Sequence, residues 1–485
     1  VGRQVRAVTS MSGAAASITD VGADAATEVN ALLNEERGSG PGRVELLRKL
    51  ADIAERSNDR IADVNIGSGN ALVSPIADAW SELATELGDL RAALHDGAAG
   101  ARGAADLFAG PRRYLVFAAN NAEMRAGSGM WLSVGILQTD NGAIDLQSMQ
   151  SVGNVPVPPG AVPIEGDLAA RWGWLSPQQE WRNLMASPRF DASAELATRM
   201  WAAAGGGPVD GVLALDPVAL KSILDVIGPV RVGEREINGG NVLEELFLNQ
   251  YLRYAAAPDN SERREELGDI AEATLDALDS RTWSATDLAR SLSDAVHGRH
   301  LLAWSTHESE MKAWSAAAMD GALPENALML SVLSRGGGKH DQFLEVESRV
   351  SFEESGRDTN VTVRVTLRNT MPEGLPRYIA GPVEGSGVGE GEYLGIVTLN
   401  APGNSRMGAI RGGDTLSTVG PDGLTQMTGT VIRLARGERH VITFRFRMPG
   451  SDGALEIQPS ARVPGIDWRV PAGRLTDDGT HIVNW

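Results

Sequence analysis

The chain has 485 residues, and a usual domain size of about 100 to 200 residues predicts about three structural units. Its 63 acidic and 44 basic residues give a formal net charge of −19, which argues against a general affinity for nucleic acid or anionic lipid surfaces. Cysteine is absent, which excludes disulfides, thiolate metal sites and cysteine nucleophiles.

Residues 1–110 have the periodicity of amphipathic helices. Apolar residues recur at steps of three and four between Ile18 and Leu32, and a Gly-Ser-Gly-Pro-Gly breaker follows. Ser74 and Pro75 have the residue types of a helix N-cap and a first helical turn. We predict a helical stalk or bundle with a structural role.

Residues 111–338 alternate between strand and helix patterns. The apolar run at 113–119 predicts a buried strand, and Asn141-Gly142 predicts a tight hairpin because both residue types tolerate positive φ. The segment 209–232 has the pattern of strand, helix and strand, with Asp216 as the helix N-cap. The zone therefore predicts an α/β sandwich whose sheet is mostly parallel with an antiparallel corner.

Residues 339–485 contain short alternating strands separated by Gly, Asp and Asn clusters, which predicts an all-β, immunoglobulin-like sandwich. Periodicity and composition change near Gly110 and Gly338. We place the boundaries of the three domains at these two glycines.

Polar residues follow the apolar run of the first predicted strand. Asn120, Asn121, Glu123 and Arg125 come just past its end, where α/β folds usually place ligands. We therefore predict that the strand breaks at these residues and that they converge on a ligand cleft.

Arginines supply a second candidate signal. Arg189 precedes a helix that begins near Asp191, Arg253 ends another helix, and Arg263 and Arg264 begin the next. Guanidinium groups are permanently charged and bidentate, which suits a pyrophosphate or an anionic sugar acid. The alternative is that each arginine pairs with a neighbouring carboxylate. The candidate ligand-binding residues are Asn120, Asn121, Glu123, Arg125, Arg189, Asp191, Arg253, Arg263 and Arg264.

Several enzyme motifs fail on spacing. The segment from His307 to Met311 lacks the second histidine of a zinc-protease helix, and the seven histidines do not have ligand spacing. We predict no metal site and assign no catalytic residue.

The middle zone resembles a known family over four segments, 114–137, 140–160, 208–232 and 241–254. They are similar to the actinobacterial envelope family called domain of unknown function 4012, which is distantly similar to LytR-CpsA-Psr proteins. Those relatives are extracytoplasmic, membrane-anchored phosphotransferases that attach polyprenyl-pyrophosphate-linked glycopolymers to peptidoglycan. The resemblance implies arginines for the pyrophosphate and aspartates for magnesium.

The chain departs from that pattern at the acids. Asn120 or Asn121 stands where the relatives have an aspartate. The motif that begins with Arg125 keeps the arginine of the relatives' motif but lacks its acidic residue. Residues 152–155, which align with the relatives' next motif, lack both of its charged residues. Mg²⁺ prefers anionic oxygen ligands, so these replacements weaken the site. We expect no cofactor, with weak Mg²⁺ binding only if the protein is an enzyme.

The resemblance implies an extracytoplasmic protein held at the cytoplasmic membrane by an N-terminal anchor outside this chain. We expect it to bind or handle an anionic wall glycopolymer or its lipid-linked precursor, without the usual magnesium-assisted transfer. One alternative is an active glycopolymer phosphotransferase in which Glu123, Asp191 or Asp216 has taken over the lost roles. The other is a non-catalytic scaffold that organises other envelope biosynthesis proteins.

Overall fold

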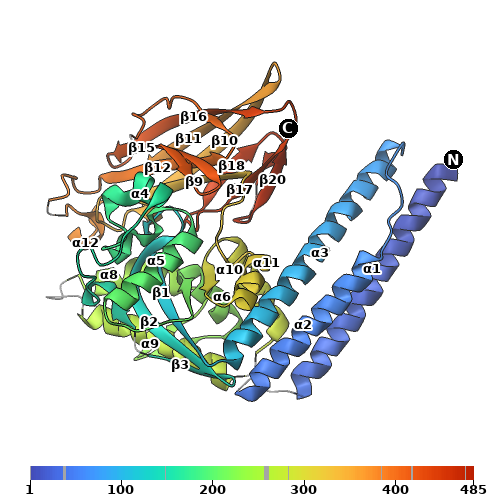
Figure 1. Ribbon diagram of the computed structural model, residues 1–485, viewed down its shortest axis with the longest axis horizontal. Coiled ribbons are helices and arrows are strands. Elements are labelled where there is room, and N and C mark those ends of the chain that lie inside the picture. The colour runs from blue at the N-terminus through green and yellow to red at the C-terminus, as the bar shows by residue number, and fades with distance from the viewer. Residues whose placement is uncertain are drawn as a thin grey trace.

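The structure is a computed structural model, and it describes residues 2–35, 40–147, 149–255, 261–281, 283–383, 385–416, 419–475 and 477–485. Three long helices form an arm that projects from a body in which a central sheet with its helices packs against two further sheets (Figure 1). None of the helices in the described ranges is both long and apolar enough to cross a bilayer.

The arm consists of α1 (Gly2–Glu35), α2 (Pro41–Ala62) and α3 (Ser74–Ala109). Val21, Ile61 and Leu87, one from each helix, form a buried cluster. The N-cap of α3 is Val73, whose side chain makes no capping bond, so Ser74 is the first helical residue rather than the predicted cap. Pro75 lies in the first turn as predicted, because proline has no N–H to leave unsatisfied there.

The central sheet has the strand order β3-β2-β1-β5-β8, and β4 also pairs with β2. Its strands are β1 (Arg112–Met124), β2 (Gly129–Asp140), β3 (Ala143–Leu146), β4 (Gln150–Ser151), β5 (Gly211–Leu215) and β8 (Leu301–Ser305). The prediction of a mostly parallel sheet is wrong, because β1 and β5 form its one parallel pair among the described strands. Short turns join β1 to β2 and β2 to β3, and only antiparallel strands can be joined in that way.

Two local predictions in this region are confirmed. Asn141 and Gly142 have φ values of 46° and 81° in the turn between β2 and β3. Asp216 caps α6 (Pro217–Ile227) by accepting bonds from the N–H groups of Val218 and Ala219.

Different helices cover the two faces of the central sheet. On one face Phe117 and Trp131 pack with Phe190 and other residues of α5 (Phe190–Ala203). On the other face Tyr114 packs with Leu107 of α3 and with α11 (Glu308–Ala316). The base of the arm is therefore part of the core of the body.

The remaining elements of the central region lie around this sheet. They are η1 (Val152–Asn154), α4 (Gly166–Trp172), η2 (Gly173–Leu175), η3 (Trp181–Ala186), β6 (Val230–Val232), β7 (Arg235–Ile237), α7 (Val242–Glu244), the π-helical turn η4 (Glu245–Asn249), α8 (Gln250–Arg253), α9 (Ser261–Ser280) and α10 (Ala285–His297).

The C-terminal sandwich consists of two six-stranded sheets that share one core. Their orders are β13-β16-β11-β10-β18-β19 and β14-β15-β12-β9-β17-β20. The elements are β9 (Ala327–Ser334), η5 (Asp341–Phe343), β10 (Leu344–Ser355), β11 (Asp358–Asn369), α12 (Arg377–Ala380), β12 (Tyr393–Pro402), β13 (Arg406–Met407), β14 (Gly420–Asp422), β15 (Thr425–Leu434), β16 (Arg439–Pro449), β17 (Ala454–Gln458), β18 (Ile466–Val470), β19 (Gly473–Arg474) and β20 (His481–Asn484).

The strand β9 lies between β12 and β17 in the second of these sheets. The boundary that we placed near Gly338 therefore falls after the first strand of the sandwich rather than before it. The apolar sequence of β9 is compatible with a strand of the central sheet or a strand of the sandwich. Its hydrogen-bonded partners, β12 and β17, place it in the sandwich.

Candidate functional site

The strand β1 does not break at its two asparagines. It continues through Asn120, Asn121 and Glu123 to Met124, with an irregular register against β2, and the turn begins at Arg125. The predicted break is wrong because partners from distant parts of the chain hold these polar side chains inside an extended strand.

The two asparagines are buried and each donates to another element. Asn120 Nδ2 donates to the Tyr251 hydroxyl at 3.0 Å. Asn121, which is fully buried, donates from Nδ2 to Asp216 Oδ2 at 2.6 Å and to the carbonyl of Ala461 at 2.7 Å. Asn121 therefore connects β1 both to the cap of α6 and to the C-terminal sandwich.

Glu123 forms an ion pair with Lys339, and both side chains are buried. The Lys339 ammonium also lies 5.5 Å from the ring centre of Tyr251 and 5.2 Å from that of Tyr378. Burial alone lowers the pKa of Lys339, but the Glu123 carboxylate and the two tyrosines outweigh it and raise that pKa. The lysine is therefore charged, and it is held by one carboxylate and two aromatic faces.

The end of β1 also bonds to a fully buried carboxylate. Asp341 accepts from the Met124 N–H at 2.9 Å, from the Tyr393 hydroxyl at 2.9 Å and from Arg462 at 3.2 Å. Burial raises the pKa of Asp341, and Arg462 opposes that shift. Asp341 and Arg462 have no exposed side-chain surface, so this ion pair is internal to the molecule.

Arg125 uses its guanidinium group to bind backbone. It donates to the carbonyls of Arg182 at 2.8 Å, Ser334 at 2.9 Å and Met124 at 3.0 Å, and to Asn183 Oδ1 at 3.2 Å. Burial lowers the pKa of Arg125 to about 10. The arginine therefore joins β1 to η3 and β9.

These contacts define a polar seam between the end of β1 and the C-terminal sandwich. We use that name for Asn120, Asn121, Glu123, Arg125, Lys339, Asp341 and Arg462. Each of these residues is 8% exposed or less.

A buried histidine extends the seam toward the surface. His300 Nδ1 lies 2.6 Å from Asp216 Oδ2, and His300 Nε2 lies 3.4 Å from Asp478 Oδ2. Burial alone lowers the pKa of His300, but the two carboxylates raise it to about 10. The imidazolium therefore bridges the cap of α6 and the last loop of the sandwich.

Arg189 and Asp191 lie in a second cluster of charged residues. Arg189 donates to Asp167 Oδ2 at 2.8 Å, and it also lies 3.7 Å from Asp422 and 3.9 Å from Asp191. Burial raises the pKa of Asp191, and Arg189 opposes that shift. The Arg189 side chain is 20% exposed and has carboxylates on several sides.

Arg253 lies in a third place. It pairs with Glu245, the first residue of the π-helical turn, which also accepts from Arg235 at 2.8 Å. The side chains of Arg263 and Arg264 lie outside the described part of the structure. The structure thus brings Asn120, Asn121, Glu123 and Arg125 together in the seam, whereas Arg189 and Arg253 have separate partners.

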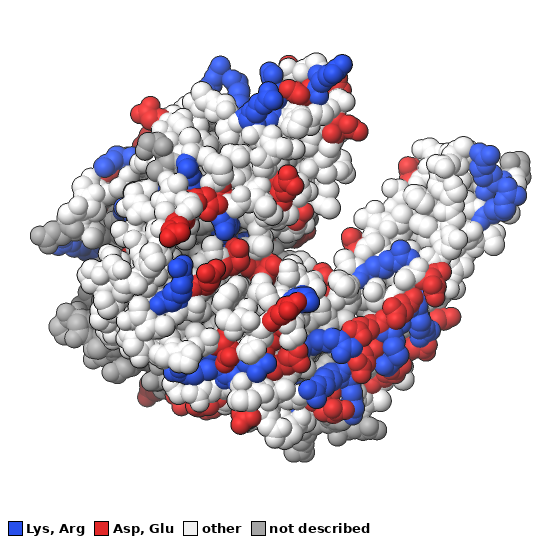
Figure 2. All heavy atoms as spheres, viewed as in Figure 1, with Lys and Arg blue, Asp and Glu red and all other residues white. Residues whose placement is uncertain are grey.

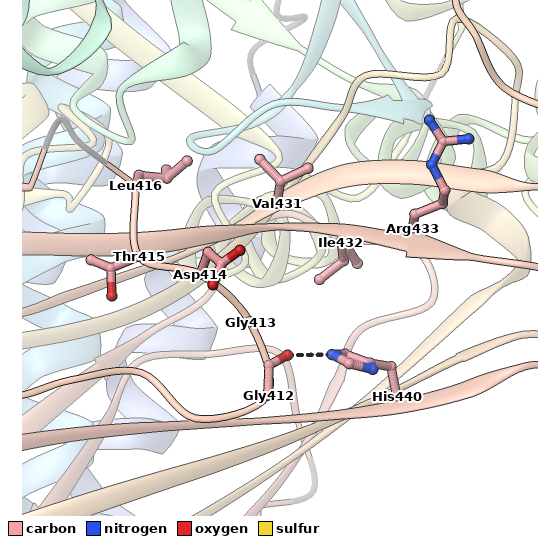
Figure 3. A pocket seen from close by; sticks show the side chains of 9 residues that line it. All are labelled: Gly412, Gly413, Asp414, Thr415, Leu416, Val431, Ile432, Arg433 and His440. Carbon is pink, nitrogen blue, oxygen red and sulfur yellow. Dashed lines mark hydrogen bonds between the residues drawn. The ribbon is translucent and has the colours of Figure 1, made fainter.

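Two cavities in the described part of the structure lie on the C-terminal sandwich. One is a hollow of about 500 Å³ beside the 412–416 loop, where His440 Nε2 lies 2.5 Å from the Gly412 carbonyl (Figure 3). The other, of about 480 Å³, lies beside Trp485. Neither cavity is lined by a residue of the polar seam. Within the described ranges, no three His, Asp or Glu residues are grouped to hold a metal ion.

Three of the seven residues of the polar seam, Lys339, Asp341 and Arg462, were not predicted from the sequence. Lys339, His340 and Asp341 follow three glycines directly, and a run of titratable residues next to a glycine-rich segment was the available signal. Arg462 is isolated in the sequence, and His300 follows Arg299 at the start of an apolar run, so neither residue carried a comparable signal.

Comparison with known proteins gives one match. Residues 109–251 match the family model described as a protein of unknown function, DUF4012. That stretch runs from the end of α3 to α8, and it contains β1 and every β1 residue of the polar seam. No curated protein and no solved structure matches the chain.

Proposed function

We propose that the protein is a non-catalytic scaffold of the cell envelope. One observation carries this proposal: the side chains at the end of β1, where a ligand cleft was expected, are bonded to the C-terminal sandwich. A buried ion pair and several hydrogen bonds occupy this place. A polymer could reach these groups only if the sandwich moved away.

The positions of the arginines support the same conclusion. The predicted pyrophosphate site requires its arginines to face one place, where each guanidinium group could donate bidentate bonds. Arg125 donates to carbonyl groups, and Arg189 and Arg253 pair with different acids. A carboxylate beside a guanidinium group also repels an incoming anion.

The envelope location rests on the sequence resemblance, as do the LytR-CpsA-Psr-like character of the central domain and the N-terminal anchor. The immunoglobulin-like character of the sandwich rests on the pattern of short alternating strands in the sequence. In this proposal the anchor holds the protein at the outer surface of the cytoplasmic membrane, and the arm and the sandwich contact other envelope biosynthesis proteins. Fractionation of the full-length protein tests the location. Recovery in the cytoplasm without an anchor would contradict it.

The function is tested by calorimetric titration with a short-chain polyprenyl-pyrophosphate analogue at low salt, with and without Mg²⁺. We expect no binding in either case. Arg189→Ala is the informative variant because this side chain is partly exposed, and Arg182→Ala is its control because Arg182 is an exposed arginine that pairs with Glu180.

The other two functions predict different results. Binding that is lost in Arg189→Ala and kept in Arg182→Ala would replace the scaffold with a protein that binds glycopolymer. Magnesium-dependent release of lipid pyrophosphate would identify a transferase. In the producing organism, a scaffold should lose its function when residues 2–94 of the arm are deleted and keep it in Arg189→Ala.

A further inference from the structure

The sandwich has an outer sheet with one face on the core and the other on solvent. This sheet has the order β13-β16-β11-β10-β18-β19, and Val363, Phe444 and Trp468 are among its core residues. The other sheet packs on the central region through Leu333 and Ile396, and in Figure 1 it lies between that region and the outer sheet. Because side chains alternate along a strand, the residues between the core positions of the outer sheet face away from the molecule. Lys and Arg side chains project from the top of the sandwich in Figure 2, where Figure 1 shows β16 and β11.

The register of the outer sheet brings arginines to directly opposite positions. Arg349 of β10 faces Arg364 of β11 on one side and Arg469 of β18 on the other. Arg469 in turn faces Arg474 of β19. Beyond β11, Arg364 faces Thr443 of β16, and the loop after β13 places a further arginine opposite that threonine. The arginine row consists of Arg349, Arg364, Arg411, Arg469 and Arg474, all of them exposed.

The arginine row has too few carboxylates to neutralise it. Within the described part of the chain, Arg349, Arg364 and Arg411 are in no ion pair. The other two arginines of the row share one acid, Asp467, at 3.6 and 2.7 Å. Like charges at directly opposite positions destabilise a sheet. The sheet therefore holds unpaired cations side by side in a chain whose formal net charge is −19, and an anion bound from outside accounts for this arrangement.

We propose that the arginine row binds a linear anionic polymer of sugars or polyols, whose charges are carboxylates or phosphates. The row runs from the edge beside β16 to β19, over five strand spacings, so it is about 24 Å long at about 4.8 Å per spacing. An exposed ion pair contributes little by itself in water, whereas several contacts to one chain add up. The row therefore suits a chain with several charges, and a lipid analogue with one pyrophosphate group is not expected to bind here.

The neighbours of the row favour a sugar or polyol chain. Thr443 lies within the row, and Ser351 and Thr362 face each other two residues farther along β10 and β11. Their hydroxyl groups both donate and accept, which suits the hydroxyls of a polymer that the arginines hold by its charges. On the other side of the row Glu347 faces Asp467. These carboxylates repel an anion and so confine the polymer to the row.

Other occupants fit this surface less well. None of the exposed large apolar side chains in the described part of the structure belongs to the six strands of this sheet. A protein interface usually has an apolar, aromatic-rich centre, and membrane binding combines basic residues with apolar ones that insert. A single-stranded nucleic acid stacks its bases on aromatic rings, which this face does not expose.

Titration of the full chain with polygalacturonate and with poly(glycerol phosphate) tests the proposal. We expect binding that weakens as salt rises, because exposed charges are screened. The polymer that binds more tightly shows whether the row recognises carboxylates or phosphates. Neutral dextran is the polymer control and should not bind. Absence of binding by both anionic polymers at low salt overturns the proposal.

The double variant Arg349→Thr/Arg364→Thr should weaken binding by about 10-fold, because it removes two adjacent arginines from the middle of the row. The fold should keep its stability, since threonine suits a strand and like charges are removed. Arg368→Thr/Arg433→Thr is the matched control, because both arginines are exposed on strands outside the row and each is paired with a glutamate. It should change the affinity less than about 2-fold in physiological salt. Equal losses would show a general charge effect and overturn the row as the site.

Thermal unfolding gives a second readout, because a ligand that binds only the folded chain raises its Tm. The polymer should raise the Tm of the natural chain and of the control variant, but not that of Arg349→Thr/Arg364→Thr. Tighter binding of a single-stranded DNA oligonucleotide or of anionic vesicles than of either polymer would identify a different ligand and overturn the proposal. The inference goes beyond the scaffold function, whose test follows lipid pyrophosphate at Arg189, so each can fail without the other.

Discussion

The ion pair between Glu123 and Lys339 joins β1 to the segment between β9 and β10 of the sandwich. Both side chains are buried, so water does not compensate a charge that loses its partner. Replacing a buried pair by apolar groups is often tolerated, whereas removing one partner is costly. The pair therefore favours one position of the sandwich against β1, because a different position would leave a buried charge without its partner.

Lys339→Met should lower the free energy of unfolding by about 3–5 kcal/mol, because it leaves the Glu123 carboxylate buried and unpaired. The double variant Glu123→Gln/Lys339→Met should recover much of that loss. Urea denaturation of the two single variants and the double variant measures the coupling. Additive losses would show that the two residues do not act as a pair.

His300 makes stability depend on pH. Its pKa is about 10 in the folded protein and about 6.5 when unfolded, so its contribution is complete below about pH 6.5. That contribution should decrease as pH rises from about 6.5 to about 10, because the folded state holds a proton that the unfolded state has lost.

Thermal unfolding of the natural chain and of His300→Gln across this pH range measures the effect. The difference in stability between the two proteins should shrink as pH rises. A constant difference would mean that the imidazole between Asp216 and Asp478 carries no charge.

At the scale of elements, the arm is held to the body where α3 crosses α11. Gly103 allows this close approach, because a Cβ atom there would lie 2.9 Å from both Ala313 Cβ and the Trp314 ring. Arg43 adds a second attachment by donating to the Gly142 carbonyl in the β2–β3 turn at 2.8 Å. The predicted hairpin turn therefore also serves as a docking point for α2.

Gly103→Val should destabilise the protein by about 1–3 kcal/mol, because the larger side chain separates α3 from α11. Gly97→Val is the control on the same helix, since a Cβ at Gly97 meets nothing within 4 Å. Urea denaturation measures the two losses, and small-angle scattering detects a displaced arm. Equal losses in the two variants would show that helix propensity alone is responsible.

At the scale of the whole molecule, the central sheet depends on both neighbours. Leu107 of α3 covers one of its faces, and the sandwich covers the polar end of β1. Sequence periodicity changes at Gly110 and Gly338, but neither position separates units that are independent of each other in the structure.

Three truncated chains test this dependence. Residues 95–485 should fold, because they keep the part of α3 that covers the sheet. Residues 111–485 should be less stable by about 2–5 kcal/mol, the usual cost of losing one large buried apolar side chain such as Leu107. Residues 1–338 should fail to fold, because Glu123 loses Lys339 and Asn121 loses the Ala461 carbonyl. Circular dichroism and urea denaturation distinguish these cases, and a stable 1–338 chain would contradict the role of the polar seam.

The sequence by itself determined the elements whose causes are local. The helical periodicity of the arm, the Asn141-Gly142 turn and the Asp216 cap depend on residues within a few positions of each other, and all three are present in the structure. The sequence also singled out the residues at the end of β1, but it predicted a strand break and a ligand cleft there, whereas the structure holds them as buried polar side chains with partners inside the strand.

Only the tertiary structure decided what those partners are. Met124 bonds to Asp341 and Asn121 to Ala461, over sequence separations of 217 and 340 residues. The pairing of β9 with the sandwich and the antiparallel order of the central sheet were settled in the same way. Local sequence patterns indicate that a buried polar group needs a hydrogen-bond partner and that a strand must pair with another strand. The packing of the whole chain decides which distant group or strand is the partner.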